Sequence, residues 1–572
     1  SRNSPILSSF RRIAAKRKPA SDNSALTNFR KIWDSGYIYS PTILVFMHKV
    51  LITGAIHPVG LERLQQESDV EIHYAPDLPY PEILKIIGSF HCILTRSETP
   101  VTRELIDCAP HLRVIARAAV GVGNIDIAYA TERGILVINT PAKNTNSAAE
   151  LTLGLLISAM RNLVPAHLQM ACEGWDRHQF TGSELLGKTL GIVGLGNVGH
   201  RVARFALAFE MKVLAYDPHI ADEVFERYQV RKVSWEELLT QADAVSAHVP
   251  KNVETTGMIG ASEIAQMKPG VVIINAARGG VVDEIALLEA LQSGQVAAAG
   301  IDTWEEEPPK NNPFRDLPQV VMTPHIGAST VEAQIRIAET IAVQVPKALR
   351  GEVVDFPVNM PAVQVLDSPV VKSYTTLAER LGLFAAQYIG FAPDRLVIQY
   401  RGGLAKYDAS LLRLCFLRGL LGNTHEYVSY VNADRVAENS GMHVEEVQDS
   451  GFTDYESAVK FQLIGREEKF QIGGVVFSGP HPRIILLNGF VCEIEPEGTI
   501  LVTTNEDRPG MIGIIGTCLG NYHVNIDQFE LSRTSRGGEA MAMIRVDDDV
   551  SEQVLADLRT RPGITSVRKI VL

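Results

Sequence analysis

Short apolar runs alternate with helical patterns from Val50 onward. The runs VLITG, VEIHYA, CILTR, VIARAAVG and ILVIN are rich in β-branched residues, and ten or more residues with Leu and Ile at helical spacing separate them. Alternation of this kind predicts a parallel sheet. A second series follows, with the runs TLGIVGLGNVG, VLAYD, AVSAHVP, VVIINAARGG, AAAGID and VVMTPHIG. Its strands are apolar throughout, as parallel strands buried on both faces must be. We therefore expect two α/β domains, each with a doubly wound parallel sheet.

Two long helical patterns connect these series to each other and to the rest of the chain. Residues 148–171 form one apolar pattern without loop residues until Gly174, which predicts a single connecting helix between the two domains. Residues 329–351 form another, which leads to the proline-punctuated stretch DFPVNMPAVQVLDSP. That stretch is the best linker in the chain.

The C-terminal part has a different pattern. Residues 366–495 mix the strands RLVIQYRG, IGGVVFSG, RIILLNG and FVCEIE with helical segments, which predicts an α+β domain, and they contain no recognisable chemical constellation. Residues 499–572 are predicted to fold as strand, helix, strand, strand, helix and strand. This βαββαβ order is that of a ferredoxin-like sandwich.

Composition excludes several classes of protein. The chain has 572 residues, of which 46% are hydrophobic and 21% charged, so it can form several folded domains. Its net charge of -12 argues against a nucleic-acid partner. The six cysteines form no CxxC pair, which predicts a reducing compartment and no metal site. No apolar stretch is long enough to span a membrane, and we expect no membrane partner.

Residues 1–46 differ from everything that follows them. They carry eight basic and two acidic residues, a net charge of +6, whereas the remainder carries -18. One interpretation is a disordered or spurious extension, with the start at Met47; the other is a transit peptide, whose composition this segment shares. We expect a cytoplasmic protein in the first case, and a plastid or mitochondrial one in the second.

A glycine motif predicts a dinucleotide site at the start of the second series. Gly194, Gly196 and Gly199 are spaced as GxGxxG, after the strand TLGIV and before a helical pattern. These glycines permit a tight turn, close approach to a pyrophosphate and close helix packing. Asp217 ends the next strand, where a carboxylate can bind a ribose hydroxyl and repel a 2′-phosphate. NAD is therefore predicted as the cofactor.

Three titratable residues follow strands of the same series. Arg278 comes after VVIINAA, Glu307 after AAAGID and His325 after VVMTP. Taken singly, each has a plain structural interpretation: a solvated loop cation, an acidic turn and a loop or core histidine. The carboxyl ends of parallel strands meet in one crevice, however, so the three side chains can converge beside a bound nicotinamide.

Four segments then carry a specific resemblance. GIVGLGNVGHRVA, INAARGGVVDE, GIDTWEEEPP and TPHIGAST, in that order, resemble the D-isomer-specific 2-hydroxyacid dehydrogenases over about residues 47–358. Within that family the whole chain is similar to the long phosphoglycerate dehydrogenases, which add an intervening domain and an ACT domain. The resemblance implies a flavodoxin-like substrate domain and a Rossmann NAD domain. The domains are then expected at 47–147 (completed by 329–358), 148–328, 364–495 and 499–572.

The resemblance also implies roles for individual residues. His325 corresponds to the catalytic acid/base, Glu307 to the carboxylate that holds it, and Arg278 to the residue that binds the substrate carboxylate and polarises its carbonyl oxygen. Substrate binding is further expected of Arg96, Ser97 and Asn124. The expected cofactor-binding residues are Thr99, Gly194, Gly196, Asn197, Val198, Gly199, Asp217, Val249, Ala276, Ala277, Asp302, Gly327 and Ala328. Gly123 stands where many relatives have Asp, which is a departure in the substrate loop.

The last domain resembles ACT modules, which bind amino acids at domain interfaces. Asn505, Asp507 and Asn525 correspond to positions that contact serine in relatives, so L-serine is an expected effector. The alternative is a module that serves assembly alone. Because the ACT and intervening domains are assembly surfaces in relatives, a homotetramer or homodimer is expected.

The resemblance implies NAD-dependent oxidation of 3-phospho-D-glycerate to 3-phosphohydroxypyruvate, the first step of L-serine synthesis. One alternative is another D-2-hydroxyacid dehydrogenase, such as a glyoxylate or hydroxypyruvate reductase, although these usually lack the two C-terminal domains. A second alternative is a non-enzymatic NAD-sensing scaffold like the C-terminal-binding corepressors. The acidic body and the ACT tail argue against the scaffold.

Overall fold

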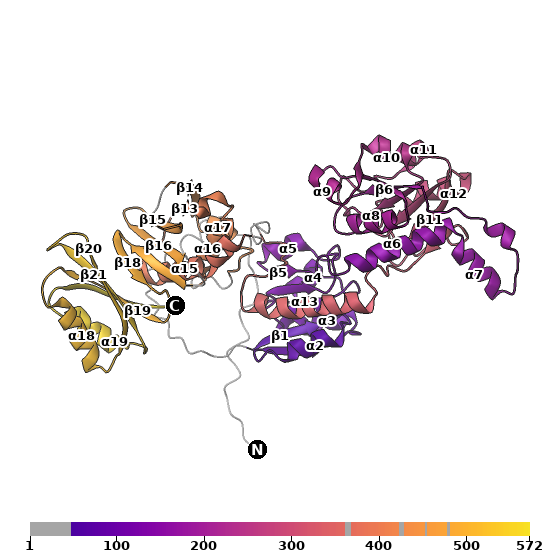
Figure 1. The fold of residues 1–572 in the computed structure, drawn as a ribbon. Helices are drawn as coiled ribbons and strands as arrows, with labels where there is room; N and C mark the ends of the chain where they lie inside the picture. Colours follow the sequence, from indigo (N-terminus) through magenta and orange to yellow (C-terminus); the bar gives the residue numbers. More distant parts are fainter. Residues whose placement is uncertain (1–46, 361–367, 423–427, 452–454, 478–480) are drawn as a thin grey trace, which may run out of the picture.

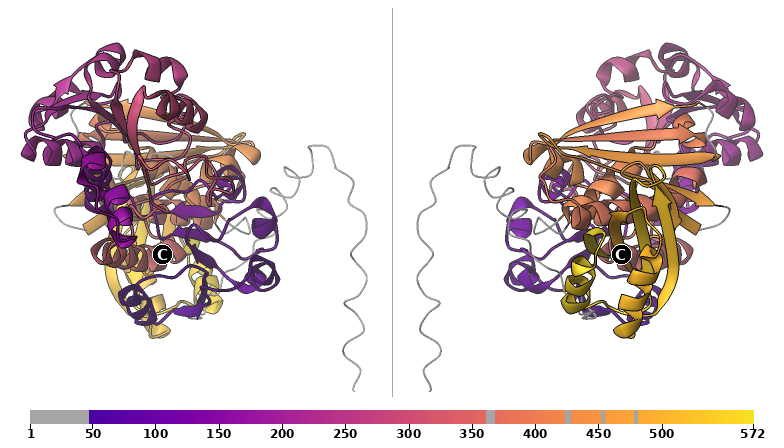
Figure 2. Two further views of the ribbon diagram at one scale, coloured as in Figure 1. Left: turned by 90° about the vertical axis from the view of Figure 1, so that its right-hand side faces the viewer. Right: turned by 90° about the vertical axis from the view of Figure 1, so that its left-hand side faces the viewer.

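The computed structural model describes residues 47–360, 368–422, 428–451, 455–477 and 481–572. The chain forms four folded units, numbered in chain order, along the long axis of the molecule. The second unit lies at one end, followed by the first, the third and the fourth (Figure 1), and Figure 2 shows the molecule end-on. The expectations for residues 1–46 and for the central part of the predicted linker, 361–367, lie outside the described residues.

The first unit contains a sheet of five parallel strands in the order β2-β1-β3-β4-β5. Its strands are β1 His48–Ile52, β2 Val70–Tyr74, β3 Cys92–Thr95, β4 Val114–Arg117 and β5 Leu136–Ile138; its helices are α2 Pro58–Gln65, α3 Tyr80–Ile86, η1 Ile87–Ser89, α4 Arg103–Asp107 and α5 Ile127–Glu132. Every residue of β3 and β4 is buried, because helices cover both faces of the sheet. This is the flavodoxin-like order that was expected.

A distant segment completes this unit. Helix α13, Val331–Leu349, lies against α2 and β4 (Figure 1), and Thr330 caps its N-terminus by accepting a hydrogen bond from the Ala333 amide. The chain beyond the helix returns to the sheet, where the Val358 amide donates to the Val137 carbonyl at 2.7 Å. Residues 331–358 therefore pack with the first sheet although they follow the second in sequence.

The second unit contains seven parallel strands in the order β12-β11-β10-β9-β6-β7-β8. Its strands are β6 Thr189–Val193, β7 Lys212–Tyr216, β8 Arg231–Lys232, β9 Ala244–Ala247, β10 Val271–Asn275, β11 Val296–Ile301 and β12 Val320–Met322; its helices are α8 Gly199–Ala208, α9 Asp222–Arg227, α10 Trp235–Gln241, α11 Ala261–Gln266 and α12 Glu284–Ser293. The order reverses between β6 and β9, which makes a crevice for a ligand at the carboxyl ends of these strands. The predicted Rossmann sheet is confirmed.

The single connecting helix predicted for residues 148–171 is wrong. The structure has two helices, α6 Thr145–Met160 and α7 Leu163–Ala171, with a bend of 69° between them and the short helix η2 Arg177–Phe180 beyond. Asn162 adopts a left-handed conformation (φ 51°), which ends the first helix. The apolar pattern continued through this residue, so periodicity alone could not reveal the break. Within the described residues no single helix is long and apolar enough to cross a membrane, whereas this bent pair meets the criterion of length and composition.

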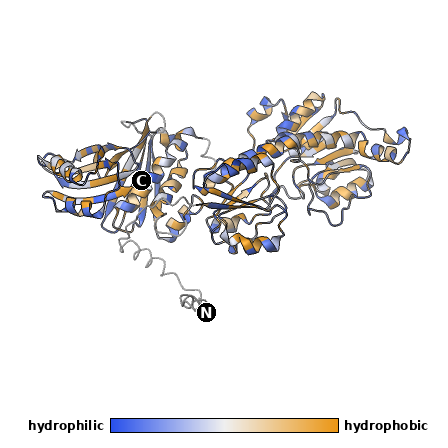
Figure 3. Ribbon diagram, turned by 90° about the horizontal axis from the view of Figure 1, so that it is seen from below, coloured by the Kyte–Doolittle hydropathy of each residue, from blue (hydrophilic) through white to orange (hydrophobic). Residues whose placement is uncertain are grey.

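The third unit has a mixed sheet in the order β14-β13-β15-β16-β17-β18. Its strands are β13 Arg395–Gly402, β14 His443–Asp449, β15 Ser457–Ile464, β16 Lys469–Phe477, β17 His481–Leu487 and β18 Phe490–Ile494; its helices are α14 Pro369–Ser373, α15 Thr375–Tyr388, η4 Gly403–Lys406, α16 Ser410–Leu421 and α17 Ala433–Asn439. Hydrophobic residues concentrate in the packed strands and helices of the four units (Figure 3). The predicted α+β class is confirmed, and β14 and β15 are additional strands.

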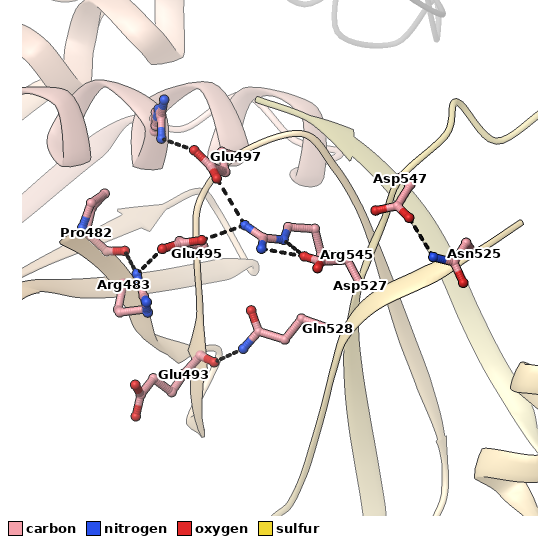
Figure 4. Close-up of polar contacts among 11 residues, drawn as sticks. Pro482, Arg483, Glu493, Glu495, Glu497, Asn525, Asp527, Gln528, Arg545 and Asp547 are labelled. Atoms are coloured by element: carbon pink, nitrogen blue, oxygen red, sulfur yellow. Dashed lines mark hydrogen bonds and ion pairs between the residues drawn. The ribbon is translucent and has the colours of Figure 1, made fainter. Parts of the chain in front are cut away.

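The fourth unit is an antiparallel sheet in the order β20-β21-β19-β22 with two helices, the predicted βαββαβ fold. Its elements are β19 Thr499–Glu506, α18 Met511–Asn521, β20 Ile526–Arg533, β21 Glu539–Val546, α19 Glu552–Thr560 and β22 Ile564–Val571. An ion network attaches it to the third unit (Figure 4): Arg545 contacts Glu495 at 2.8 Å, Glu497 at 3.2 Å and Asp527, while Arg483 contacts Glu495 at 2.6 Å.

Candidate active site

The glycine motif forms a cradle between β6 and α8. Gly194 has a φ of 93°, and a Cβ built there would lie 2.8 Å from Cγ1 of Val249. A Cβ on Gly199 would lie 2.0 Å from the Gly194 carbonyl oxygen, whereas among the described residues a Cβ on Gly196 would point into open space. Only glycine fits the first and third positions, and the second leaves room for another molecule to approach the backbone. Asn197 and Val198 complete the turn into α8, so these residues fit a dinucleotide pyrophosphate at the helix N-terminus.

Asp217 anchors this cradle from the end of β7. Its Oδ2 accepts a hydrogen bond from the Leu195 amide at 2.8 Å, and its Oδ1 accepts one from the His219 amide at 3.0 Å. The carboxylate is partly buried and keeps further acceptor sites for a ribose hydroxyl. Its position fits NAD, as the sequence predicted.

Glu307 and His325 come together from the ends of neighbouring strands. Nδ1 of His325 lies 2.9 Å from Oε1 and 2.8 Å from Oε2 of Glu307. Since Nδ1 donates to the carboxylate, Nε2 is the ring nitrogen that remains for a reacting molecule. The side chains are 44% and 39% exposed, so the pair is open to a substrate.

The charges around this pair shift its protonation. The hydrogen bond to Glu307 raises the pKa of His325, an effect that burial opposes and that the charges of Glu307 and Asp302 reinforce. Burial alone would raise the pKa of Glu307, but hydrogen bonds from His325 and from the Trp304 amide outweigh burial and lower it. The imidazolium and the carboxylate therefore stabilise each other.

Arg278 faces the same region from the loop after β10. Its Nη1 donates to the Ala277 carbonyl at 2.6 Å, while the Asn275 side chain holds the loop by donating to the Arg278 carbonyl at 3.0 Å. A Cβ on Gly121 of the first unit would lie 3.4 Å from Nη2 of Arg278. The guanidinium thus sits where the two α/β units meet, and its charge acts on both Glu307 and His325.

The remaining predicted cofactor residues of the second unit follow the ends of its strands, whereas Thr99 lies buried in the loop after β3 of the first unit. Val249 follows β9, and Ala276 and Ala277 follow β10. Asp302 is fully buried after β11 and accepts hydrogen bonds from the amides of Ile326 and Gly327. Ala328 accepts a hydrogen bond from the Gln334 side chain at the start of α13.

The predicted substrate residues lie in loops at the carboxyl edge of the first sheet. Arg96 follows β3 and donates to the Ala55 carbonyl at 2.9 Å. Asn124 donates to the carbonyls of Ser97, at 3.0 Å, and Thr99, at 3.1 Å. Asn124 therefore holds the loop of residues 96–99 in place, and its amide nitrogen is occupied in doing so.

Arg117 is a candidate that sequence reasoning missed. It ends β4 and is 4% exposed, and its Nε donates to the Gly121 carbonyl at 2.9 Å. A second nitrogen contacts the Arg96 carbonyl, and burial lowers the pKa of Arg117 to about 10. A buried cation whose hydrogen bonds go to backbone carbonyls retains charge for an anion. Its place at the end of an apolar strand was the available sequence signal.

The predicted effector residues are not all together. Asn505 and Asp507 line a cavity of about 360 Å³ with Pro509, Gly510, Ile512 and Leu531. Asn505 is 1% exposed, and its Oδ1 has no hydrogen-bond partner among the described residues. Asn525 lies elsewhere, bonded to Asp547 at 2.6 Å (Figure 4). Asn525 does not line that cavity, so among the described residues of one chain the three side chains do not form a single site.

No group of metal-binding side chains occurs within the described ranges.

The comparisons with known proteins agree with the division of the chain into these folded units. Residues 153–327 match the NAD-binding domain of D-isomer specific 2-hydroxyacid dehydrogenases, residues 370–488 match the D-3-phosphoglycerate dehydrogenase intervening domain, and residues 499–563 match the ACT domain.

Similar proteins extend along nearly the whole chain. A D-3-phosphoglycerate dehydrogenase of Methanocaldococcus jannaschii is 39% identical over 528 residues, which cover 92% of this chain and 100% of that protein. One of Bacillus subtilis is 36% identical over 527 residues, with the same coverage. The structure of a glyoxylate reductase from Paecilomyes thermophila matches 55% of this chain and 98% of its own, with 31% identity and a TM-score of 0.50. The chain therefore belongs to the D-3-phosphoglycerate dehydrogenases, within the D-isomer-specific 2-hydroxyacid dehydrogenase family.

Proposed function

We propose that this protein catalyses the NAD-dependent oxidation of 3-phospho-D-glycerate to 3-phosphohydroxypyruvate, the first step of L-serine synthesis. The observation that carries the proposal is the hydrogen-bonded pair His325 and Glu307, with Arg278 beside it, at the crevice that the glycine cradle also borders. Relatives that match the whole chain are named for this activity.

The side chains divide the chemistry among them. Neutral His325 takes the proton of the C2 hydroxyl at Nε2, while Glu307 holds Nδ1 and stabilises the imidazolium that forms. Arg278 binds the substrate carboxylate and stabilises charge at the oxygen on C2. Bound NAD supplies the acceptor for the hydrogen and electron pair that leave C2. In the reverse direction, protonated His325 returns the proton to that oxygen.

Cations at the edge of the first sheet suit the substrate's phosphate. Arg117 is buried with its hydrogen bonds directed to backbone carbonyls, and Arg96 lies beside it. A guanidinium of this kind forms strong charge-assisted hydrogen bonds to phosphate. Glu98 is the carboxylate of this chain that acts on Arg117, and two guanidinium groups here exceed that single negative charge. This excess positive charge favours the phosphorylated acid over glyoxylate or hydroxypyruvate.

Kinetics on the protein starting at Met47 test this assignment. We would measure kcat/KM for 3-phosphoglycerate with NAD, and for hydroxypyruvate and glyoxylate with NADH. A clear preference for the phosphorylated pair is expected. A preference for the unphosphorylated acids would instead indicate another D-2-hydroxyacid dehydrogenase, such as a glyoxylate or hydroxypyruvate reductase. Intact NAD binding without any turnover would favour a non-enzymatic NAD-sensing scaffold.

We infer that L-serine binds the cavity beside Asn505 and Asp507. The buried Oδ1 of Asn505 offers an acceptor for an ammonium group, and the backbone amides at the start of α18 suit a carboxylate. Calorimetry with L-serine on the wild type and on Asn505→Ala tests this inference. Binding that the substitution weakens would support it, and the absence of binding at millimolar serine would remove it.

Self-association through helix α7 is also proposed. None of its residues is buried, although the helix is apolar: Leu168 is 58% and Met170 is 54% exposed, and Trp175 beyond the helix is 80% exposed. A patch of this kind is costly in water and typical of an interface. Light scattering should show a smaller particle for Leu168→Glu, and an unchanged one for Val491→Glu, a control on the third unit that is 70% exposed. An unchanged size for both variants would refute this interface.

A further inference from the structure

Trp304 contacts two of the turns that carry the catalytic side chains. It lies just after β11 and is 6% exposed. Its amide N–H donates to Oε1 of Glu307 at 3.1 Å, and its indole N–H donates to the Thr323 carbonyl at 3.1 Å, two residues before His325. One residue thus connects the turn that carries the carboxylate to the turn that carries the histidine.

The loop that carries Arg278 rests on the same residue. A Cβ on Gly279 would lie 1.7 Å from the Trp304 carbonyl oxygen, so the backbone after Arg278 packs directly against that of Trp304. The indole ring itself lies 6.3 Å from the ring of Phe314, which is fully buried. Trp304 therefore lies between the loops that carry all three catalytic side chains.

Asp302 holds the histidine turn from the other side. Its Oδ1 accepts hydrogen bonds from the Thr323 hydroxyl at 2.6 Å and the Ile326 amide at 2.7 Å, and its Oδ2 accepts one from the Gly327 amide at 2.9 Å. A Cβ on Gly327 would lie 3.2 Å from that Oδ2, so a side chain there would crowd the carboxylate.

The turn needs this support because of its backbone. His325 has a φ of 53°, in the left-handed region that non-glycine residues seldom occupy. Such a conformation persists only where the surrounding contacts enforce it. The bonds to Thr323, Ile326 and Gly327 are placed on both sides of His325 and can do so.

We propose that Trp304 and Asp302 are positioning residues that hold the turns of Glu307 and His325 so that Nδ1 of the imidazole faces the carboxylate and Nε2 is left for the substrate. This inference deepens the proposed function and rests on it. The indole N–H is its most specific element, because phenylalanine can replace the ring of tryptophan but not that hydrogen bond.

The proposal predicts how His325 titrates when the hydrogen bonds made by Trp304 and Asp302 are weakened. The charged groups that act on its imidazole are Glu307, Asp302 and Arg278. Glu307 and Asp302 raise the pKa of His325, and Arg278 lowers it. Since the hydrogen bond to Glu307 is the largest of these effects, a turn that drifts from Glu307 lowers the pKa of His325.

The test compares Trp304→Phe with Phe314→Leu in the full chain. Trp304→Phe removes the indole hydrogen bond and retains a large ring, so kcat/KM should fall by about three- to tenfold. Tm should fall as well, because the Thr323 carbonyl loses its donor, so the pH profile is the readout that distinguishes the two variants. Phe314→Leu removes buried ring atoms but no hydrogen bond, so Tm should fall while the pH profile stays that of the wild type.

A second readout does not require activity. Diethylpyrocarbonate reacts with unprotonated imidazole, and peptide mass spectrometry follows His325 alone as pH varies. Trp304→Phe and Thr323→Val should both move the midpoint of His325 modification to lower pH, whereas Phe314→Leu should not. A wild-type midpoint in the first two variants, or an equal shift in Phe314→Leu, would overturn the proposal. If the wild type did not oxidise 3-phosphoglycerate, the proposed function would be wrong. The titration of His325 would still test whether Trp304 and Asp302 position its turn, because it does not depend on turnover.

Discussion

Replacing Asp217 with asparagine tests whether one charge selects NAD over NADP. The carboxylate sits at the end of β7 and holds the glycine cradle through the Leu195 amide at 2.8 Å and the His219 amide at 3.0 Å. Asparagine keeps one carbonyl oxygen, so it can retain one of these bonds while it removes the charge. Asp217→Ala would remove the charge and both hydrogen bonds together, so the effect of the charge could not be separated from a change in the loop structure.

The size of the effect follows from Coulomb's law. Two unit charges roughly 4 Å apart repel by about 1 kcal/mol in water and about 4 kcal/mol near a protein surface. A phosphate monoester carries nearly two charges at neutral pH. Because Asp217 is only partly buried, we take the lower limit. The repulsion of a 2′-phosphate is then at least about 2 kcal/mol, or about 30-fold in affinity.

The assay is kcat/KM with each dinucleotide, together with its Kd from calorimetry. Asp217→Asn should lower the preference for NAD by about 30-fold, mainly through better use of NADP. Asp222→Asn, which removes an exposed charge on the next helix, serves as the control and should leave the preference unchanged. An unchanged preference in Asp217→Asn, or an equal change in the control, would refute the reasoning.

Three further substitutions follow from the site. Because Glu307 raises the pKa of His325, the rate of oxidation should increase and that of reduction decrease as pH rises through that pKa. Glu307→Gln should move the midpoints of both pH–rate profiles to lower pH. Unchanged midpoints would contradict the hydrogen bond between Glu307 and His325 as the cause of the raised pKa. His325→Ala should lower kcat by about two to four orders of magnitude with an unchanged Kd for NAD, which calorimetry and steady-state kinetics measure together. Arg117→Met should raise KM for 3-phosphoglycerate by about 10- to 100-fold through loss of charge-assisted hydrogen bonds, but affect hydroxypyruvate much less. Equal effects on both substrates would remove Arg117 from the phosphate site.

The order and type of most elements could be predicted from local pattern. Apolar runs separated by helical spacing predicted both parallel sheets, and the βαββαβ order predicted the last domain, because buried strands and amphipathic helices impose their periods directly on the sequence. The glycine motif and Asp217 could be found in the same way, since a tight turn followed by a helix leaves a local signature. The place of Glu307 and His325 after strands of one sheet made them candidates, and the family resemblance supplied their roles.

Long-range geometry decided the rest. The break at Asn162 depends on one left-handed residue inside an unbroken apolar pattern. The burial of Arg117 and the separation of Asn525 from Asn505 depend on which loops and helix ends meet in space. The role of Trp304 depends on a carbonyl that lies 19 residues further along the chain. The sequence by itself determined which helices and strands form, because the repeat of buried apolar positions in each of them can be read from neighbouring residues. Only the tertiary structure decided which side chains meet, because hydrogen bonds between distant loops produce no repeating pattern in the sequence.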